Sequence, residues 1–337
     1  MTINSYISKL NRKQNMLRDE ATSFLGQILD DHTIADELIA EAITAVTNKG
    51  ATIEEILGFL DAMQSRMIKL DIDDGVIDTC GTGGDRSGTF NISTASALLI
   101  ASDGVKVAKH GNRSASSKCG SADVLEELNI PINNSPAEAI KSIKQHNFCF
   151  LFAQAYHPSL KRLGGIRKQL GFPTVFNILG PLLNPASVDR QVIGTFSAKN
   201  AERIAEIVAK RGTSHTLVIR SFDGLDEASL SDSTHIIEIK DEAVREYDIS
   251  PNNFNLQLSS VAELQGGDAK TNADIIRSTL KKSNNLSAHQ RVTALNAGLG
   301  FYVSGTSVSI DIGVERAINL LRSNKPSELL KRLHSDG

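Results

Sequence analysis

Residues 76–101 read VIDTCGTGGDRSGTFNISTASALLIA, and this stretch decides the fold that the sequence predicts. Val76–Cys80 has the apolar, β-branched character of a short strand, and Ala95–Ala101 is an apolar run typical of a buried helix. The four glycines between them predict a flexible turn, and Ser93 or Thr94 is expected to cap the helix. Such a turn and a helix N-terminus offer backbone N–H groups to a phosphate. The alternative is a tight turn that only joins a strand to a helix.

Strand and helix signals alternate after this stretch, whereas residues 3–70 carry helical spacing only. Strands are expected at 76–80, 105–108, 148–152, 192–196 and 217–219, helices at 122–128, 136–146 and 201–210, a hairpin at 235–239 and 243–247, and two last helices at 287–303 and 312–323. Alternating strands and helices favour a parallel sheet covered by helices. We therefore predict an α/β fold, with a small helical domain plus a larger α/β domain around a central, mostly parallel sheet.

The domain boundaries follow from where this alternation begins and where it is interrupted. The helical N-terminal domain is expected to span 1–72, and about 157–187 is expected to return to it as a hinge or helical segment, because four prolines at 158–185 break the rhythm. Residues 73–156 and 188–337 are expected to form the α/β domain. A helix at 160–170 is expected inside the interruption.

The composition excludes several classes of function. The 337 residues include 36 basic and 39 acidic side chains, and the net charge of −3 argues against a nucleic-acid binder. Tryptophan is absent and aromatic residues make up 5%, which argues against base-stacking surfaces and membrane-interface belts. Cys80, Cys119 and Cys149 are too widely spaced for a disulfide framework or zinc site, so buried free thiols are expected. The sequence has no signal-like start and no apolar run near membrane-spanning length, so a cytoplasmic location without membrane contact is expected.

Two further loops follow predicted strands and carry charged groups. Residues 109–118, KHGNRSASSK, combine three cations with hydroxyls and suit a polyanionic ligand, although a solvated polar loop is the alternative. Residues 223–227, DGLDE, place adjacent carboxylates beside a glycine, a pattern that can hold Mg²⁺ or form an acidic surface turn. Because these loops accompany the glycine turn, one shared phosphate site is the better explanation.

These blocks resemble the motifs of the anthranilate phosphoribosyltransferase family. In the family's order, the chain has GTGGD at 81–85, NIST at 91–94, KHGNRSASS at 109–117, TVFNILGPLLNP at 174–185 and DGLDE at 223–227. The resemblance implies transfer of phosphoribosyl from 5-phosphoribosyl-1-pyrophosphate to anthranilate in tryptophan biosynthesis. It also implies a fold of the nucleoside phosphorylase and phosphoribosyltransferase type, and a homodimer formed through the helical domain.

The resemblance implies the ligand sets as well. Phosphoribosyl pyrophosphate is expected to contact Gly81, Gly84, Asp85, Thr89, Asn91, Ile92, Ser93, Thr94, Lys109, His110, Gly111, Asn112, Arg113, Ser114, Ala115, Ser116, Ser117 and Ser121. Anthranilate is expected at Gly81, Asn112 and Arg167, with His110, His157 and Pro181 near its channel. Magnesium, as two ions per subunit, is expected on Ser93, Asp226 and Glu227. No residue is assigned as a general base or a covalent nucleophile.

The chain departs from the family pattern at two places, and two other functions stay open. Arg86 stands where the family usually has glycine, and Gly164-Gly165-Ile166 replaces a small residue and proline before Arg167. The first could alter pyrophosphate or magnesium affinity, and the second could loosen a hinge. A pyrimidine-nucleoside phosphorylase shares this architecture, but the Asp226-Glu227 pair favours the transferase. A nucleic-acid-binding relative without catalysis would have a basic groove and eroded motifs, whereas this chain is net acidic and keeps every block.

Overall fold

The computed structural model describes residues 1–72, 75–114 and 118–335. The chain folds into two compact units. The first comprises residues 1–69 and 154–185, and the second comprises residues 70–153 and 186–337. Each unit is described by itself below. Across the described residues, no helix is long and apolar enough to cross a membrane.

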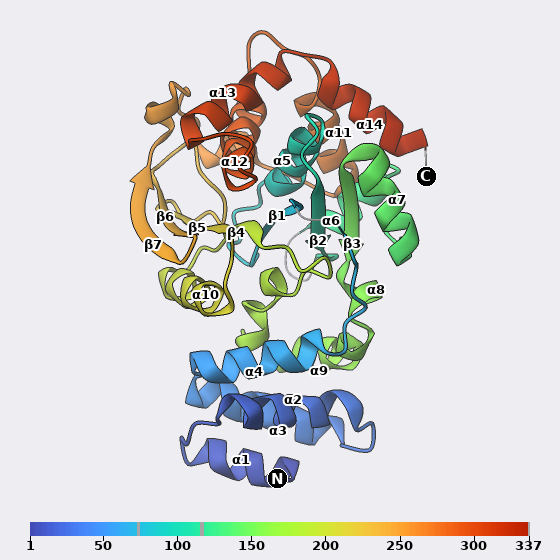
Figure 1. Ribbon diagram of the computed structural model, residues 1–337, viewed down its shortest axis with the longest axis vertical. Helices are drawn as coiled ribbons and strands as arrows, with labels where there is room; N and C mark the ends of the chain where they lie inside the picture. The colour runs from blue at the N-terminus through green and yellow to red at the C-terminus, as the bar shows by residue number, and fades with distance from the viewer. Residues whose placement is uncertain (73–74, 115–117, 336–337) are drawn as a thin grey trace. The chain divides into compact units, whose positions relative to one another are not determined.

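The first unit is helical (Figure 1). Its helices are α1 (Ile3–Asn11), α2 (Arg18–Asp30), α3 (Asp36–Lys49), α4 (Ile53–Gln64) and α9 (Lys161–Leu170), with α8 (Ala153–Tyr156) at the boundary and short 3₁₀ turns η1 (Pro158–Leu160), η2 (Val175–Asn177) and η3 (Gly180–Leu182). Helices α2 and α4 pack closely because residue 58 is glycine: a Cβ there would lie 2.3 Å from the carbonyl oxygen of Arg18. The helix predicted at 160–170 is confirmed as α9.

Local capping explains where α4 begins, but not where α3 begins. Thr52 caps α4, and the buried carboxylate of Glu55 returns the bond by accepting from the N–H of Thr52 over 2.7 Å. Neither Asp31 nor Thr33, which are residue types that commonly cap helices, caps α3, because its N-cap is Ala35. Asp31 instead ends α2, and its Oδ1 accepts from the N–H of Thr33 over 2.9 Å. The two residues form a local turn that competes with capping.

The second unit contains one seven-stranded sheet in the order β3-β2-β1-β4-β5-β6-β7. The strands are β1 (Ile77–Gly81), β2 (Val107–Gly111), β3 (Phe148–Phe152), β4 (Arg190–Gly194), β5 (His215–Ser221), β6 (Thr234–Lys240) and β7 (Ala243–Ile249). The first five strands in this order, β3, β2, β1, β4 and β5, run parallel, and β6 and β7 extend the sheet as an antiparallel hairpin. The predicted fold class and hairpin are therefore confirmed.

Helices cover both faces of this sheet (Figure 1). Helix α5 (Ile92–Ala101) joins β1 to β2, and α10 (Ala198–Arg211) joins β4 to β5, so the two connections run in opposite directions along the sheet. Because such crossovers are right-handed, the two helices lie on opposite faces. The other helices are α6 (Ser121–Glu127), α7 (Pro136–His146), α11 (Ala269–Thr279), α12 (Ala288–Val303), α13 (Ile310–Leu321) and α14 (Lys325–Ser335), with 3₁₀ turns η4 (Pro251–Phe254) and η5 (Val261–Leu264).

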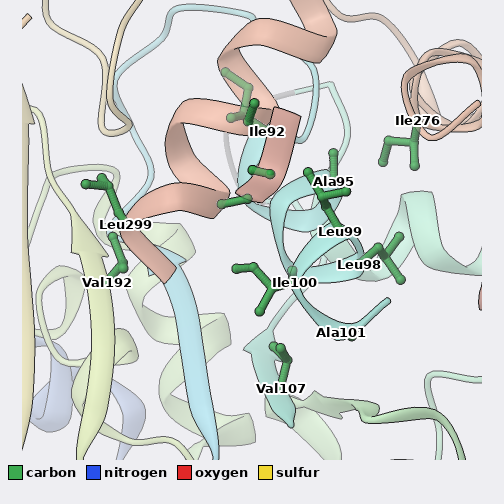
Figure 2. Close-up of a cluster of buried hydrophobic side chains, with 14 of the residues drawn as sticks. Ile92, Ala95, Leu98, Leu99, Ile100, Ala101, Val107, Val192, Ile276 and Leu299 are labelled. Carbon is green, nitrogen blue, oxygen red and sulfur yellow. The ribbon is translucent and has the colours of Figure 1, made fainter. Parts of the chain in front are cut away.

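The core of the unit surrounds α5, which is apolar on all sides. Figure 2 shows Leu98 and Leu99 of this helix in one cluster with Val192 of β4, Ile276 of α11 and Leu299 of α12. A helix without a polar face must be buried on every side, and α5 packs against both β1 and α12. The N-terminus of α5 is thereby fixed beside the carboxyl end of β1.

The structure corrects several predictions in this unit. The N-cap of α5 is Asn91, not Ser93 or Thr94, and the helix begins at Ile92. Helices α11 and α14 were not predicted; α11 begins at the side-chain cap of Asp268. The three cysteines are free thiols as predicted, with Cys119 and Cys149 buried and Cys80 only partly covered.

Candidate active site at the carboxyl ends of the central strands

The order of the parallel strands reverses between β1 and β4. The chain winds from β1 toward β2 and β3 on one side, and from β4 toward β5 on the other. At such a point the loops that leave the two carboxyl ends diverge and open a crevice for ligands. The N–H of Thr82, just after β1, donates to the carbonyl oxygen of Gly194 at the end of β4 over 2.8 Å. The predicted glycine turn therefore starts at this crevice.

Glycines at both strand ends let the loop after β5 approach closely. A Cβ on Gly81 would lie 2.5 Å from Asp226 Oδ2, and a Cβ on Gly194 would lie 1.6 Å from the carbonyl oxygen of Asp226. At Gly194 the clash is with backbone, so only glycine fits there, whereas a side chain at residue 81 would displace the Asp226 carboxylate. The loop after β5 is thus seated against the ends of β1 and β4.

Three carboxylates lie close together where the loop after β5 packs against the ends of β1 and β4. Oxygen atoms of Asp85, Asp226 and Glu227 all lie within 4.8 Å of one another. Burial, followed by repulsion from Asp85, raises the pKa of Asp226, and burial, followed by repulsion from Asp226, raises the pKa of Glu227. Among the described residues, Asp85 Oδ2 is a buried oxygen without a hydrogen-bond donor. A cluster of carboxylate oxygens whose mutual repulsion is not balanced by nearby cations suits a divalent cation such as Mg²⁺.

Two other residues hold this loop in place. The side-chain amide of Asn296, on α12, donates to the carbonyl oxygen of Ala228 and accepts from its N–H, each over 2.9 Å. Asp223 accepts from the hydroxyls of Ser229 and Ser231 and from the N–H of Leu225. Asp223 therefore shapes the loop, while Asp226 and Glu227 join the cluster. Sequence reasoning missed Asn296 and did not place Asp85 with the metal ligands, because neither is near residues 226–227 in the sequence.

The turn between β1 and α5 presents backbone amides to the crevice. Gly83 (φ 64°), Gly84 (φ 86°) and Gly88 (φ 70°) adopt left-handed conformations that glycine allows freely. The N-cap residue Asn91 makes no capping bond with its side chain, because its amide bonds the Cys119 carbonyl and Asn272 instead. The first turn of α5 thus has no side-chain cap, although the N–H of Ile92 donates to the carbonyl oxygen of Phe90 (2.7 Å) and that of Thr94 to Asn91 (3.1 Å).

The residues predicted on α5 divide between the crevice and the core. The side chains of Ile92 and Thr94 are fully buried, so only their backbone can face a ligand. The hydroxyl of Ser93 accepts from Lys109 Nζ over 3.3 Å. Thr89 Oγ1 lies 3.2 Å from Ser87 Oγ, and its backbone pairs with Gln265.

Lys109 is a buried cation that links three elements. Its side chain is 2% exposed, and Nζ donates to the carbonyl oxygen of Thr79 over 2.6 Å as well as to Ser93. Burial lowers the pKa of Lys109, and the nearby carboxylate of Asp78 opposes that shift most strongly. A buried ammonium that contacts β1 and the first turn of α5 can balance negative charge at the crevice.

The loop between β2 and α6 is built around Asp123. Its carboxylate accepts from the N–H groups of Gly120 (2.8 Å) and Ser114 (3.1 Å) and from the guanidinium of Arg113 (2.9 Å). Arg113 also pairs with Glu126, so its charge is neutralised inside the loop. Gly111 must be glycine here, because a Cβ would lie 2.2 Å from Ser121 Oγ.

The remaining predicted residues of this loop are placed as follows. Ser121 Oγ donates to the carbonyl oxygen of Asn112 over 3.3 Å. The N–H of His110 points to Asp78 Oδ1 at 3.4 Å, and its side chain is mostly buried. Ala115, Ser116 and Ser117 lie outside the described residues.

Arg167 belongs to the first unit and lies on α9. Its guanidinium carbon sits 5.5 Å from the centre of the Phe176 ring, and Nη2 donates to Asn177 Oδ1 over 3.3 Å. Burial lowers the pKa of Arg167. His157 Nε2 bonds the carbonyl oxygen of Leu183 over 3.0 Å, and burial lowers the pKa of this imidazole. Pro181 lies in η3.

Comparisons with known proteins agree with this arrangement. The family model described as glycosyl transferase family, helical bundle domain, matches residues 4–67, and the one described as glycosyl transferase family, a/b domain, matches residues 73–326. The chain is 41% identical over 329 residues to the anthranilate phosphoribosyltransferase of Geobacillus thermodenitrificans, covering 98% of this chain and 96% of that one. The chain belongs to the anthranilate phosphoribosyltransferase family. The resemblance seen in the motifs is thus confirmed.

Solved structures of the family share the whole fold. The anthranilate phosphoribosyltransferase of Thermus thermophilus superposes with a TM-score of 0.90 at 33% identity and 98% coverage of both chains. The Saccharomyces cerevisiae enzyme, in complex with PRPP and Mg, superposes with a TM-score of 0.88 at 25% identity, covering 99% of this chain and 97% of that one. Both units of this chain therefore have counterparts in the family.

Proposed function

We propose that this chain catalyses the magnesium-dependent transfer of the phosphoribosyl group from 5-phosphoribosyl-1-pyrophosphate to the amine of anthranilate, in tryptophan biosynthesis. The products are N-(5-phosphoribosyl)anthranilate and pyrophosphate. The observation that carries the proposal is the meeting of an amide-rich turn, residues 82–91, with the carboxylates Asp85, Asp226 and Glu227 at one strand end. A phosphate site beside a cation site is what a pyrophosphate-bearing donor requires. The choice of anthranilate as the acceptor rests on membership in the family.

The donor's pyrophosphate fits the turn and the start of α5. Left-handed glycines give the turn a backbone that can bring N–H groups close to an anion, and the first turn of α5 has no side-chain cap that would compete with a phosphate. Departure of pyrophosphate breaks the C1–O bond, and the electron pair leaves with the oxygen. Lys109 and the turn's amides are preorganised to stabilise that negative charge without rearrangement.

The carboxylate cluster fits magnesium by the chemistry of its donors: all are hard oxygens, the pKa values of Asp226 and Glu227 are raised, and Asp85 carries a buried oxygen without a hydrogen-bond donor. Asp226 and Glu227 would hold the metal, with Asp85 beside them and two ions expected per subunit. When bound, magnesium neutralises the donor's phosphates and makes pyrophosphate a better leaving group. Ser93, a further proposed ligand, bonds Lys109 in this structure.

The acceptor needs positioning more than activation. An aromatic amine attacks C1 as its free base, forming the N–C1 bond and then losing a proton, so no general base is assigned. We assign Arg167 as the clamp for the anthranilate carboxylate, with Gly81 and Asn112 as further contacts. Its guanidinium is partly desolvated and keeps donors free beside the single bond to Asn177. His157 and Pro181 complete the proposed approach to that clamp.

The loop after β2 completes the donor site in this proposal. Lys109 through Ser117, with Ser121, would surround the ribose and phosphates. The ion pairs of Arg113 with Asp123 and Glu126 favour a role for that guanidinium in shaping the loop. Asn112 is placed at the loop's start, where its carbonyl accepts from Ser121.

We further propose a cytoplasmic homodimer that forms through the helical unit. The resemblance to the family carries this proposal, and Leu17, at the N-cap of α2, is 74% exposed on that unit and serves as a probe of it. Sedimentation of wild type and Leu17→Glu tests this arrangement. The charged variant is expected to dissociate at concentrations at which the wild type sediments as a dimer.

A three-way assay separates the proposed function from its alternatives. Purified protein is given anthranilate, phosphoribosyl pyrophosphate and magnesium; or uridine or thymidine with phosphate; or DNA at low and high salt. Anthranilate consumption in the first arm alone supports the transferase. Phosphorolysis would identify a pyrimidine-nucleoside phosphorylase, and salt-dependent DNA retention without turnover would identify a nucleic-acid-binding relative.

A further inference from the structure

Arg86 occupies the centre of the turn that the proposed function assigns to pyrophosphate. Its φ angle is +59°, in the left-handed region that non-glycine residues avoid. The glycines around it, Gly84 and Gly88, have φ angles of the same sign. A long cationic side chain is therefore carried at a position whose backbone would suit glycine better.

The surrounding hydrogen bonds hold this conformation from both sides. The N–H of Gly83 donates to Asp226 Oδ2 over 2.9 Å, and the N–H of Ser87 donates to Asp85 Oδ1 over 3.2 Å. On the far side, Gln265 Nε2 donates to the carbonyl oxygen of Ser87, and the N–H of Gly266 donates to that of Gly88, each over 2.8 Å. The backbone of Arg86 therefore lies between two parts of the turn that are each held by hydrogen bonds.

The guanidinium of Arg86 is exposed, and within the described part of the chain it forms no hydrogen bond or ion pair. It follows Asp85 directly in the chain, yet among the described residues no ion pair joins it to any of the three clustered carboxylates. Lys13 offers a contrast: its φ is +61°, but its ammonium donates to the carbonyl oxygen of Asn48 over 2.7 Å. The charge of Arg86 therefore remains available to a ligand that enters the turn.

We propose that Arg86 is a further pyrophosphate-binding residue of this chain. The inference rests on the proposed function, which places a pyrophosphate group in the turn. Guanidinium groups bind phosphate oxygens through paired, charge-assisted hydrogen bonds. Arg86 therefore strengthens binding of both the phosphoribosyl donor and the pyrophosphate product. Because the side chain is exposed, the gain is moderate and sensitive to salt.

Calorimetric binding of magnesium pyrophosphate to the full-length protein tests the proposal. Arg86→Gly removes the charge and suits the backbone, Arg86→Gln removes the charge but keeps a side chain at positive φ, and Arg86→Lys keeps the charge. We expect Arg86→Gly and Arg86→Gln to weaken binding by about threefold to tenfold at low salt, and Arg86→Lys to weaken it less. The deficit is expected to shrink at about 0.5 M salt.

Two controls keep the result specific. Arg322→Gln removes the same charge from the exposed C-cap of α13 and is expected to leave binding unchanged. Thermal unfolding of Arg86→Gly is expected to match or exceed wild type, because glycine adopts a φ of +59° without strain. Weakening by Arg322→Gln as large as that by Arg86→Gln would mean a general charge effect and would overturn the proposal.

The outcomes separate this inference from the proposed function. A wild type that consumes anthranilate while Arg86→Gly binds magnesium pyrophosphate equally well overturns the arginine's role alone. A wild type that consumes no anthranilate but binds magnesium pyrophosphate overturns the proposed acceptor, and the comparison of Arg86 variants still decides the arginine. A wild type that does not bind magnesium pyrophosphate overturns both.

Discussion

The backbone N–H of Gly83 donates a hydrogen bond to Asp226 Oδ2 over 2.9 Å, across 143 residues of sequence. This bond ties the turn after β1 to the loop after β5. The turn is the proposed binding site for pyrophosphate, and Asp226 is a proposed magnesium ligand. The hydrogen bond therefore links the proposed phosphate site to the proposed cation site, and a change on either side should affect both.

Removing the charges of the carboxylate pair should weaken the response to magnesium. Asp226→Asn with Glu227→Gln keeps the size of both side chains but removes two negative charges from the cluster. We expect the magnesium concentration for half-maximal activity to rise by about tenfold or more. Asp241→Asn, an exposed residue of the β6–β7 turn with φ +46°, is the matched control. An unchanged magnesium titration in the double variant would reject the assignment.

A methyl group at residue 194 should displace the loop after β5, which carries the proposed magnesium ligands Asp226 and Glu227. Because its Cβ would lie 1.6 Å from the carbonyl oxygen of Asp226, Gly194→Ala is expected to lower the free energy of unfolding by about 1–3 kcal/mol. If the proposed magnesium site is correct, it should also raise the magnesium concentration needed for half-maximal activity. Gly164→Ala in α9 meets no atom within 4 Å and is expected to stabilise the protein by about 0.5–1 kcal/mol. Urea unfolding measures both, and a Gly194→Ala protein as stable as wild type would contradict the packing described here.

Arg167 should act on one substrate only. Arg167→Ala is expected to raise the KM for anthranilate by about tenfold or more, with little change in the KM for phosphoribosyl pyrophosphate, because the lost guanidinium is the proposed partner of the acceptor's carboxylate. Its exposed neighbour on α9, Lys168→Ala, controls for a change in charge. Equal increases in both KM values would remove Arg167 from the clamp.

Glu238 should make stability depend on acid pH. Burial raises the pKa of this carboxyl, but hydrogen bonds from His215 (2.7 Å), Tyr302 (2.7 Å) and Tyr247 (3.1 Å) outweigh burial and lower the pKa to about 2. Since the folded pKa lies below the unfolded value of about 4.3, the carboxylate stabilises the fold above that pH. The contribution is lost as the pH falls from about 4.3 toward 2.

The corresponding test is urea unfolding between pH 7 and pH 3. Glu238→Gln is expected to be less stable than wild type by about 2–3 kcal/mol at pH 7, with a difference that narrows at pH 3. Glu242→Gln, at the exposed hairpin turn, should follow wild type throughout. A difference between Glu238→Gln and wild type that stays constant with pH would contradict the assigned pKa.

Elements with strong local signals could be predicted closely from the sequence. Helix α7 spans Pro136–His146 and β3 spans Phe148–Phe152, both as predicted, and the side chain of Ser135 caps α7. These succeed because a cap followed by proline, and a short apolar run, act over a few residues. The start of α5 was mispredicted because Asn91 takes its partners from Cys119 and Asn272, which are distant in the sequence.

The candidate site shows the same division. The sequence was enough to propose Asp226 and Glu227 as metal ligands, because adjacent carboxylates in a glycine loop are a local pattern. The fold adds Asp85, brought in by the turn after β1, and Asn296, which holds the loop from α12 across 68 residues. No local pattern could have identified these contacts. The motif predicted that Ile92 and Thr94 contact the phosphoribosyl donor, but it could not show that their side chains are buried in the core.

The most direct test of the proposed function follows the fluorescence of anthranilate with purified protein, while pyrophosphate release is measured in parallel. With phosphoribosyl pyrophosphate and magnesium present, the fluorescence should fall, and one pyrophosphate should appear for each anthranilate consumed. Omission of either the donor or magnesium should stop both signals. Because the chain contains no tryptophan, its own emission should interfere little. Stable anthranilate fluorescence in the complete mixture, or consumption without the donor, would contradict the proposed transfer.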